Sequence, residues 1–293
     1  MINYNSSSAL RAFLDQEGLG MQKKFGQNFL INPKVREDLA GALDASSGSD
    51  VWEIGPGLGA MTDLLLKKNL KVKAFEIDIG FIRVLKKLFS ENENFNLVEG
   101  DAMKTWQAEK PVQFLLGNLP YNIAAALLAD FIEEGRTFKR MVVTVQKEVA
   151  LRMGASAGSK DYSSFSVLCA SMYKVKPLMV IRKESFFPQP NVDSMGVLFE
   201  NRFSDAGDQG KYPQIFYPLV RSLFASRRKT VKNNLTAFIS SRFVNLKELS
   251  GMSAQDLCIE VLRANDVKEN ERAENLDFNA FLSLANSIDN MRL

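Results

Sequence analysis

The amino-acid sequence predicts an α/β protein, in which a large domain built on a parallel sheet precedes a smaller all-helical domain. Three observations support this prediction. The chain has 293 residues, which exceeds the usual size of one domain. Short apolar runs alternate with amphipathic stretches from residue 50 to about residue 146, a pattern typical of a parallel sheet covered by helices. Beyond residue 213 the apolar residues recur at helical spacing.

The strands expected in the sheet are short and mostly apolar. They comprise residues 50–54, 72–77, 95–98, 112–116 and 141–145. The helices expected between them comprise residues 61–70, 81–89 and 123–132. Two later apolar runs, at 177–181 and 195–199, could extend the same sheet.

A polar stretch with two glycines, residues 201–210, predicts a linker between the two domains. We therefore expect a catalytic domain over residues 1–203 and a helical domain over residues 211–293. In the second of these, Ile215, Leu219 and Leu223 are spaced to lie on one face of a helix.

The composition excludes several kinds of chemistry. The chain has no histidine, which excludes Ser-His-Asp and Cys-His catalysis and histidine-ligated zinc. Cys169 and Cys258 lie far apart in the sequence and cannot by themselves form a tetrahedral metal site, so we expect no metal. They could form one disulfide, but such sparse cysteine usage suits a reducing cytosol better. Without a recognisable secretion signal or membrane span, a soluble cytoplasmic protein is expected.

A glycine-rich turn and two acids follow three successive expected strands. The turn is Glu53-Ile-Gly-Pro-Gly-Leu-Gly59, where glycines let the backbone approach a ligand and the next helix offers free N–H groups. Its spacing differs from the G-x-G-x-x-G of dinucleotide sites. Glu76 can accept hydrogen bonds from both hydroxyls of a ribose, and Asp101 follows the third strand. Since the carboxyl ends of parallel strands share one crevice, the three features predict a nucleotide-like site.

The fourth expected strand leads into Asn118-Leu-Pro-Tyr121. This run resembles the Asn/Asp-Pro-Pro-Tyr-type signature of methyltransferases that modify exocyclic amines of nucleobases. Together with the glycine turn and the acids, it resembles the class I S-adenosylmethionine-dependent methyltransferases, which have a Rossmann-like domain. Asn118 Oδ1 and the Leu119 carbonyl could hold both hydrogens of an adenine N6 amine, and Tyr121 could stack on the flipped purine. The expected catalytic residues are therefore Asn118, Leu119 and Tyr121.

A segment ahead of the first strand narrows the resemblance. Lys24-Phe-Gly-Gln-Asn28-Phe-Leu30 resembles the Gly-Gln-x-Phe-Leu segment of the ribosomal RNA adenine dimethyltransferase family. In that family the segment covers the methionine end of the cofactor. The resemblance implies that S-adenosylmethionine is bound by Asn28, Leu30, Gly55, Gly57, Glu76, Asp101, Ala102 and Asn118.

Two further segments resemble the RNA-binding parts of this family. In the loop Phe187-Pro-Gln-Pro-Asn-Val-Asp-Ser194, the residues from Pro188 match the Pro-x-Pro-x-Val-x-Ser part of its Phe-x-Pro-x-Pro-x-Val-x-Ser pattern. Phe187 could press against the flipped base. Arg227, Arg228 and Lys229 match the Arg-Arg-Lys of the small-subunit enzymes and could grip phosphates, although a solvated basic face is the simpler interpretation of composition alone. The family usually has Gly where this chain has Ser163 and Gln where it has Ala170, so the resemblance gives no expectation for the loop around these residues.

The resemblance implies N6,N6-dimethylation of two adjacent adenosines near the 3′ end of small-subunit (16S) ribosomal RNA, during assembly of that subunit. We expect a monomer whose partner is this RNA in a partly assembled particle. Two alternatives stay open. One is an antibiotic-resistance methyltransferase acting on large-subunit RNA, which the Arg-Arg-Lys segment disfavours. The other is a non-catalytic assembly or transcription factor on the same fold, which intact Asn118–Tyr121 disfavours. The spacing of the glycines disfavours a further alternative, a nicotinamide-dependent oxidoreductase.

Overall fold

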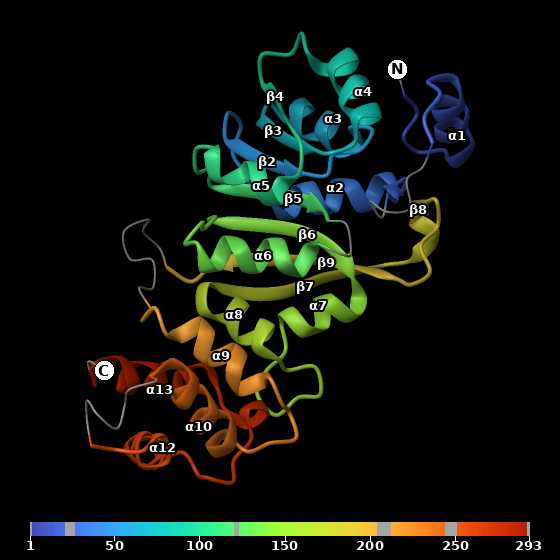
Figure 1. The fold of residues 1–293 in the computed structure, drawn as a ribbon. Coiled ribbons are helices and arrows are strands. Elements are labelled where there is room, and N and C mark those ends of the chain that lie inside the picture. The colour runs from blue at the N-terminus through green and yellow to red at the C-terminus, as the bar shows by residue number, and fades with distance from the viewer. Residues whose placement is uncertain (1, 21–26, 120–122, 204–211, 244–250, 292–293) are drawn as a thin grey trace. The chain divides into compact units, whose positions relative to one another are not determined.

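The computed structural model describes residues 2–20, 27–119, 123–203, 212–243 and 251–291. The described chain forms two compact units (Figure 1). One unit combines Met1–Leu151 with Tyr173–Arg202, and the other combines Arg152–Met172 with Phe203–Leu293. The first contains the sheet and the second is helical.

A seven-stranded sheet with the order β4-β3-β2-β5-β6-β9-β7 forms the centre of the first unit. Its strands are β2 (Asp50–Ile54), β3 (Lys71–Glu76), β4 (Phe95–Glu99), β5 (Phe114–Asn118), β6 (Arg140–Gln146), β7 (Tyr173–Ile181) and β9 (Ser194–Asn201). Strands β4 to β6 in this order run parallel, whereas β9 is antiparallel to both of its neighbours. The predicted parallel sheet is confirmed, and the two later apolar runs do extend it.

Helices cover both faces of this sheet because alternate strand residues point to opposite sides. On one face, Leu39 of α2 (Pro33–Ala42) and Leu65 of α3 (Ala60–Lys67) pack in a cluster with Val51 and Val72. On the other face lies α6 (Ala124–Glu133). The remaining helices that begin in this unit are α1 (Ser7–Gln16), α4 (Ile79–Phe89), α5 (Ala102–Thr105), the short 3₁₀ turns η2 (Trp106–Ala108) and η3 (Lys183–Ser185), and α7 (Lys147–Met153).

An aromatic layer fixes α6 to the sheet. Phe131 of α6 lies 5.1 Å from Trp106 and 6.3 Å from Trp52, measured between ring centroids. The guanidinium of Arg136 lies over both indoles, 5.4 Å from the Trp52 ring and 5.2 Å from that of Trp106. Both tryptophans of the chain therefore pack against one cation in the first unit.

The strand register brings the carboxyl ends of four strands to one edge of the sheet. Ile54 lies opposite both Phe75 and Gly117, and Glu76 lies opposite Glu99. The segments that follow β2, β3, β4 and β5 consequently leave the sheet side by side. A separate two-stranded sheet pairs β1 (Phe29–Leu30) with β8 (Phe186–Phe187) in antiparallel orientation.

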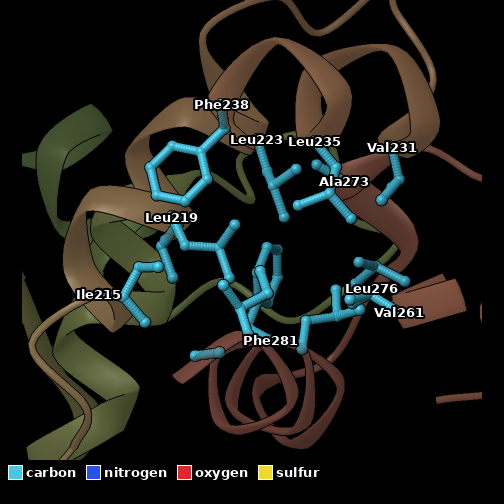
Figure 2. Packing of buried hydrophobic residues seen from close by; sticks show 14 of the residues in the cluster. Ile215, Leu219, Leu223, Val231, Leu235, Phe238, Val261, Ala273, Leu276 and Phe281 are labelled. Carbon is cyan, nitrogen blue, oxygen red and sulfur yellow. The ribbon is translucent and has the colours of Figure 1, made fainter. Parts of the chain in front are cut away.

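The second unit is a group of helices around one apolar core (Figure 2). Its elements are α8 (Ser164–Met172), α9 (Phe216–Phe224), α10 (Val231–Arg242), α12 (Ala254–Ala264), the 3₁₀ turn η4 (Ala273–Asn275) and α13 (Phe278–Asn290). Leu219 of α9, Leu235 of α10, Val261 of α12 and Phe281 of α13 are all inaccessible to solvent. The helical spacing seen beyond residue 213 therefore reflects a core shared by these helices.

The division between the units differs from the expected boundary at residue 203, because Arg152–Met172 belongs to the helical unit. Tyr162 explains this placement: its buried ring packs in the helical core, and its hydroxyl donates a 2.9 Å hydrogen bond to the Leu276 carbonyl. Most of the expected linker, residues 201–210, lies outside the described residues. No helix in the described part of the chain has the length and apolar content of a membrane span.

Candidate active site

A cavity of about 290 Å³ lies at the sheet edge where β2, β3, β4 and β5 end. Its volume is near the lower end of the range for small-molecule sites, about 300–1,000 Å³. It is lined by all the residues to which the sequence assigned cofactor binding, namely Asn28, Leu30, Gly55, Gly57, Glu76, Asp101, Ala102 and Asn118. Leu119 lines it as well. The structure thus brings these residues from five separate segments together.

The turn after β2 depends on glycine at two positions. Gly57 has a φ of 57°, and a Cβ there would lie 3.0 Å from the Phe29 ring. Gly59 has a φ of 88°, and a Cβ there would lie 2.5 Å from the Phe89 ring. Residues that carry a side chain rarely adopt such φ angles, and at these two positions a Cβ atom would also collide with an aromatic ring. The glycines therefore let the backbone pass tightly beneath β1 and into the first turn of α3.

Glu76 is buried at the end of β3, and backbone donors fix its carboxylate. Oε1 accepts 2.9 Å hydrogen bonds from the N–H groups of Ile77 and Asp78, and Oε2 accepts one of 3.1 Å from Gly57. Burial raises the pKa of Glu76 to about 7, although these hydrogen bonds oppose the shift. The carboxylate is thus rigidly placed at the cavity wall and ready to accept hydrogen bonds from hydroxyl groups.

Glu53 is a second buried acid that lines the cavity, and the sequence assigned it no role. Its Oε2 accepts a 2.7 Å hydrogen bond from the Thr62 hydroxyl. Burial, together with the nearby charge of Glu76, raises the pKa of Glu53 to about 8, although the hydrogen bond from Thr62 opposes the shift. The sequence signal that could have identified Glu53 as a site residue was its position at the start of the glycine-rich turn. Two acids within one enclosed site create an environment that favours a cationic ligand.

Asp101 is both a cavity residue and a helix cap. Its Oδ1 accepts a 3.0 Å hydrogen bond from the Met103 N–H and so caps α5. The preceding Gly100 N–H donates a 2.8 Å hydrogen bond to the Glu76 carbonyl, which ties the end of β4 to the end of β3. Part of the hydrogen-bonding capacity of Asp101 is therefore already used within the protein.

Asn118 ends β5 with its side-chain amide held in one orientation. Nδ2 donates a 2.9 Å hydrogen bond to the backbone carbonyl of Asn28, in the segment just ahead of β1. Oδ1 accepts no hydrogen bond from the described residues. The following Leu119 is buried, and its N–H donates to the Thr144 carbonyl at 3.1 Å. The third expected catalytic residue, Tyr121, lies outside the described residues.

Phe187 is held beside the cavity and is not among the residues that line it. Strand pairing sets it opposite Phe29, and the Arg11 guanidinium of α1 lies 5.6 Å from its ring centroid. Half-buried, it packs against a cluster that includes Leu10 of α1. The loop that begins at Phe187 and the segment that contains Asn28 and Leu30 are therefore joined through the pairing of β1 with β8.

The N-terminal segment also forms part of the cavity wall, which the sequence did not suggest. Tyr4 and Leu10 line the cavity, and the Tyr4 hydroxyl donates a 3.0 Å hydrogen bond to the Leu58 carbonyl. Buried Arg36 donates to the carbonyls of Leu30, at 2.6 Å, and of Tyr4, at 3.3 Å. Arg36 belongs to α2, a helix that was not predicted from the sequence, so no sequence signal indicated this role. It ties the N-terminus to β1.

The three predicted phosphate-binding residues lie in the turn between α9 and α10, residues 226–230, which we call the basic turn. Their side chains have different surroundings. Arg227 is paired with Glu274, with a nitrogen-to-oxygen distance of 2.9 Å. Arg228 and Lys229 are exposed, and their side chains form no hydrogen bond or ion pair with the described residues. Asn234 of α10 is buried and donates hydrogen bonds to the Leu223 and Ser226 carbonyls, so it closes the end of α9.

The described residues contain no group of three or more acidic or cysteine side chains that could hold a metal ion. Both cysteines are unpaired and buried.

Comparison with known proteins yields a consistent set of relatives. A family model described as ribosomal RNA adenine dimethylase matches residues 18–288. The ribosomal RNA small subunit methyltransferase A of Treponema denticola is 46% identical, over 99% of this chain and 97% of that protein. The protein of the same name in Borreliella burgdorferi is 36% identical, over 98% and 96%.

Solved structures show the same likeness in three dimensions. A dimethyladenosine transferase from Plasmodium falciparum has a TM-score of 0.75 and 28% identity, covering 89% of this chain and 98% of that one. The 23S rRNA methyltransferase ErmE has a TM-score of 0.61 and 18% identity, covering 89% and 99%. The second likeness is one of fold alone.

Proposed function

Since the chain belongs to the ribosomal RNA adenine dimethylase family, we propose that it transfers methyl groups from S-adenosylmethionine to N6 of two adjacent adenosines. These lie near the 3′ end of small-subunit ribosomal RNA. The relatives named for the small subunit match nearly the whole chain, whereas the likeness to a 23S rRNA methyltransferase extends only to the fold. The observation that supports this chemistry best is the fixed amide of Asn118.

The residues of the cavity fit S-adenosylmethionine. The glycine turn leaves room for a ligand close to the backbone, and the carboxylate of Glu76, which lines the cavity, would accept hydrogen bonds from ribose hydroxyls. Glu53 adds a second buried acid, which suits a ligand that carries positive charge. Asp101 and Ala102 would border the adenine, and Asn28 and Leu30 the methionine end. When bound, the cofactor supplies an electrophilic methyl group on a sulfonium.

Asn118 would activate the target amine by positioning it. The N6 lone pair of adenine is conjugated with the ring, which makes the amine a poor nucleophile. Because the Asn28 carbonyl holds Nδ2, the planar amide leaves Oδ1 available to accept an N6 hydrogen. The Leu119 carbonyl would accept the other hydrogen. Such acceptors favour a pyramidal nitrogen whose lone pair faces the methyl group, so they stabilise the transition state more than the ground state.

The target adenosine must leave its stack to reach this site. Tyr121 would stack on the extruded purine, and Phe187 would border it from the β8 loop, which strand pairing already joins to the cofactor segment. N6 accepts the methyl group as the carbon–sulfur bond of the sulfonium breaks to leave a neutral thioether, and N6 then releases one proton to solvent. The reaction therefore relies on positioning of the amine and needs no histidine or metal.

The second unit would dock the folded RNA through its basic turn. Arg228 and Lys229 offer charges that no described acid neutralises, and unpaired cations are what a phosphate backbone attracts. We propose a partly assembled small ribosomal subunit in the cytoplasm as the substrate and a monomer as the active form.

The decisive test is a methyl-transfer assay with labelled S-adenosylmethionine on unmethylated small subunits, with unmethylated large subunits as the matched control. We expect N6-dimethyladenosine at two adjacent positions near the 3′ end of the small-subunit RNA only. Label in large-subunit RNA would contradict the assigned substrate. Absence of transfer to either particle would favour a non-catalytic assembly factor.

A further inference from the structure

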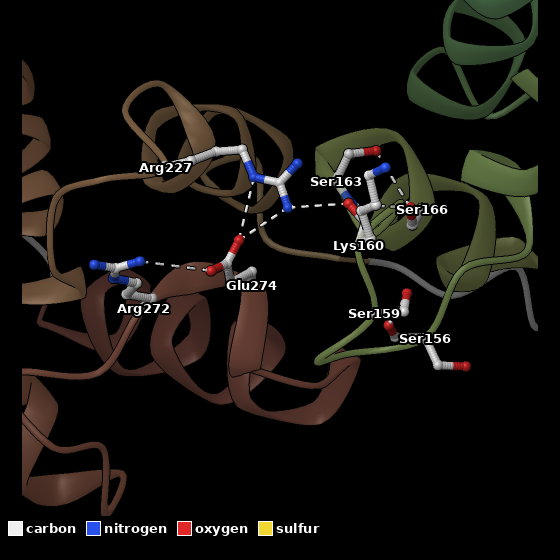
Figure 3. A network of polar contacts seen from close by, with 8 residues as sticks. All are labelled: Ser156, Ser159, Lys160, Ser163, Ser166, Arg227, Arg272 and Glu274. Carbon is white, nitrogen blue, oxygen red and sulfur yellow. Dashed lines mark hydrogen bonds and ion pairs between the residues drawn. The ribbon is translucent and has the colours of Figure 1, made fainter. Parts of the chain in front are cut away.

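Hydrogen bonds tie the loop between α7 and α8, residues 154–163, to the Arg227 side chain of the basic turn (Figure 3) and to Glu274 of η4. Arg227 Nη2 donates to the Lys160 carbonyl at 3.3 Å, and the Gly158 N–H donates to the Glu274 carbonyl at 2.7 Å. At the end of the loop, Tyr162 is anchored in the helical core. The loop is therefore held against the turn although 67 positions separate Lys160 from Arg227 in the sequence.

Arg227 is largely occupied by these contacts. Its Nε and Nη2 lie 3.2 Å and 2.9 Å from the same oxygen of Glu274, while Nη2 also reaches the loop. The Arg272 guanidinium lies 3.9 Å from the other carboxylate oxygen. A guanidinium paired with a carboxylate presents less positive charge to an incoming phosphate. Arg227 is consequently better placed to hold the loop than to bind RNA.

Lys160 is the cation that this arrangement adds to the turn. Its side chain is exposed and forms no hydrogen bond or ion pair with the described residues, as is also true of Arg228 and Lys229. Arg227 adjoins Lys160 in space and Arg228 in sequence. Unneutralised cations from two segments therefore gather around the Arg227–Glu274 pair.

We propose that the 154–163 loop is part of the RNA-docking surface of the second unit, with Lys160 in contact with an RNA phosphate. Arg227 is the positioning residue that keeps the loop in place through Glu274. The inference rests on the proposed function, because it takes ribosomal RNA as the partner. An ammonium group without an acidic partner gains charge neutralisation from a phosphate, and the counterions it displaces make the contact visible in a salt series.

The first test compares Lys160→Ala with Lys68→Ala, each of which removes one exposed positive charge. Lys68 follows the C-terminus of α3, at the end of that helix away from the glycine turn, and its side chain has no described partner. The probe is an unmethylated transcript of the 3′ region of small-subunit RNA, titrated across a salt series. We expect Lys160→Ala to flatten the slope of log K against log salt by about 0.7–0.9. Lys68→Ala should leave it unchanged. An unchanged slope for Lys160→Ala overturns the proposal.

The second test uses the sign of the effect of Glu274→Gln. If Arg227 itself grips a phosphate, release from Glu274 should tighten RNA binding and steepen the slope. If Arg227 positions the loop, Glu274→Gln should flatten the slope, and adding Lys160→Ala should flatten it little further. A steeper slope, or flattening by the two changes that simply adds, overturns the positioning role. Glu274→Asp keeps the charge and should recover part of the slope, which a general loss of folding would not allow.

Failure of this inference is distinguishable from failure of the proposed function. Methyl transfer by the unaltered protein to small subunits is measured in parallel. Absence of transfer rejects the function, whereas normal transfer with an unchanged Lys160→Ala slope rejects only the loop. Affinity for S-adenosylmethionine, measured by calorimetry, should be equal in all these variants because the cavity belongs to the first unit.

Discussion

The cavity of the first unit and the basic turn of the second were both assigned from sequence motifs, and they differ in what places their side chains. Around the cavity, strand ends and backbone hydrogen bonds determine the positions: Glu76 is held by three N–H groups and Asn118 by one carbonyl. In the turn, the partner of each side chain depends on acids elsewhere in the unit. Glu274 neutralises Arg227 and leaves Arg228 without a described partner.

This difference shows which motif residues can be assigned a role from sequence. A parallel sheet brings its strand ends together whatever the rest of the sequence does, so residues at those ends share a site. A run of basic residues guarantees only charge, and nearby carboxylates decide how much of it faces solvent. The following predictions test this contrast.

The largest effect is expected from Asn118→Ala. Without the Oδ1 acceptor the target amine loses its transition-state hydrogen bond, so kcat should fall by roughly 100-fold or more, while cofactor affinity stays within a few fold. Single-turnover methyl transfer and calorimetry measure the two quantities. Near-normal turnover would mean that the fixed amide has no catalytic role.

Glu76→Ala should act on cofactor binding. Loss of a buried acceptor should weaken the free energy of cofactor binding by about 1–3 kcal/mol. Asp101→Ala should weaken it less, because capping of α5 already uses part of the hydrogen-bonding capacity of Asp101. Glu99→Ala is the matched control, since Glu99 lies opposite Glu76 in the register but is exposed and paired with Lys86. Equal cofactor affinity in the Glu76 and Glu99 variants would remove Glu76 from the binding site.

The buried acids predict opposite pH dependences for stability and binding. Burial raises the pKa values of Glu76 and Glu53 to about 7 and about 8, above their value of 4.5 when exposed. Between about pH 5 and pH 8 the unfolded chain therefore binds fewer protons than the folded chain, and the free protein should lose stability as the pH rises.

A cationic ligand favours the ionised acids, so affinity for S-adenosylmethionine should rise as the pH passes through 7 to 8. The gain should be at most about tenfold per pH unit for each carboxylate. Thermal melts and calorimetry across this range measure both effects, and Glu53→Gln should reduce both. The same pH dependence for S-adenosylhomocysteine, which lacks the sulfonium charge, would contradict the electrostatic cause.

The smallest effect is expected in the basic turn. Changing Arg228 and Lys229 together to Ala should flatten the salt dependence of RNA binding by about 1.4–1.8, without changing the melting temperature. Arg227→Ala should also lower the melting temperature, because it breaks the contacts with Glu274 and the loop. If the alanine variants of all three residues changed only the salt slope, Arg227 would bind RNA in the same way as Arg228 and Lys229, which would contradict the distinction drawn between them.

Strand positions were the most predictable part of this chain. Residues 50–54 agree with β2 throughout, because an apolar run that ends in glycines has few other interpretations. Asn118 and Glu76 could be placed together for the same reason. Glu53 escaped assignment because strand alternation alone does not reveal which buried acid faces a ligand.

Long-range contacts between side chains were beyond prediction. Nothing near Arg36 in the sequence indicates that it would hold Tyr4 and Leu30, and nothing near Arg227 indicates Glu274. Arg152–Met172 belongs to the helical unit because Tyr162 donates a hydrogen bond to the carbonyl of Leu276, 114 positions later in the sequence. Such contacts arise from packing, which local periodicity does not encode.

The indole pair around Arg136 makes the two units optically distinct. Both tryptophans belong to the first unit, so indole emission excited at long wavelength reports the unfolding of the sheet unit alone. The helical unit has no tryptophan, whereas far-ultraviolet dichroism reports the helices of both units. A denaturant titration followed by both signals therefore separates the two melting transitions without any label, and their coincidence or separation measures how strongly the units are coupled.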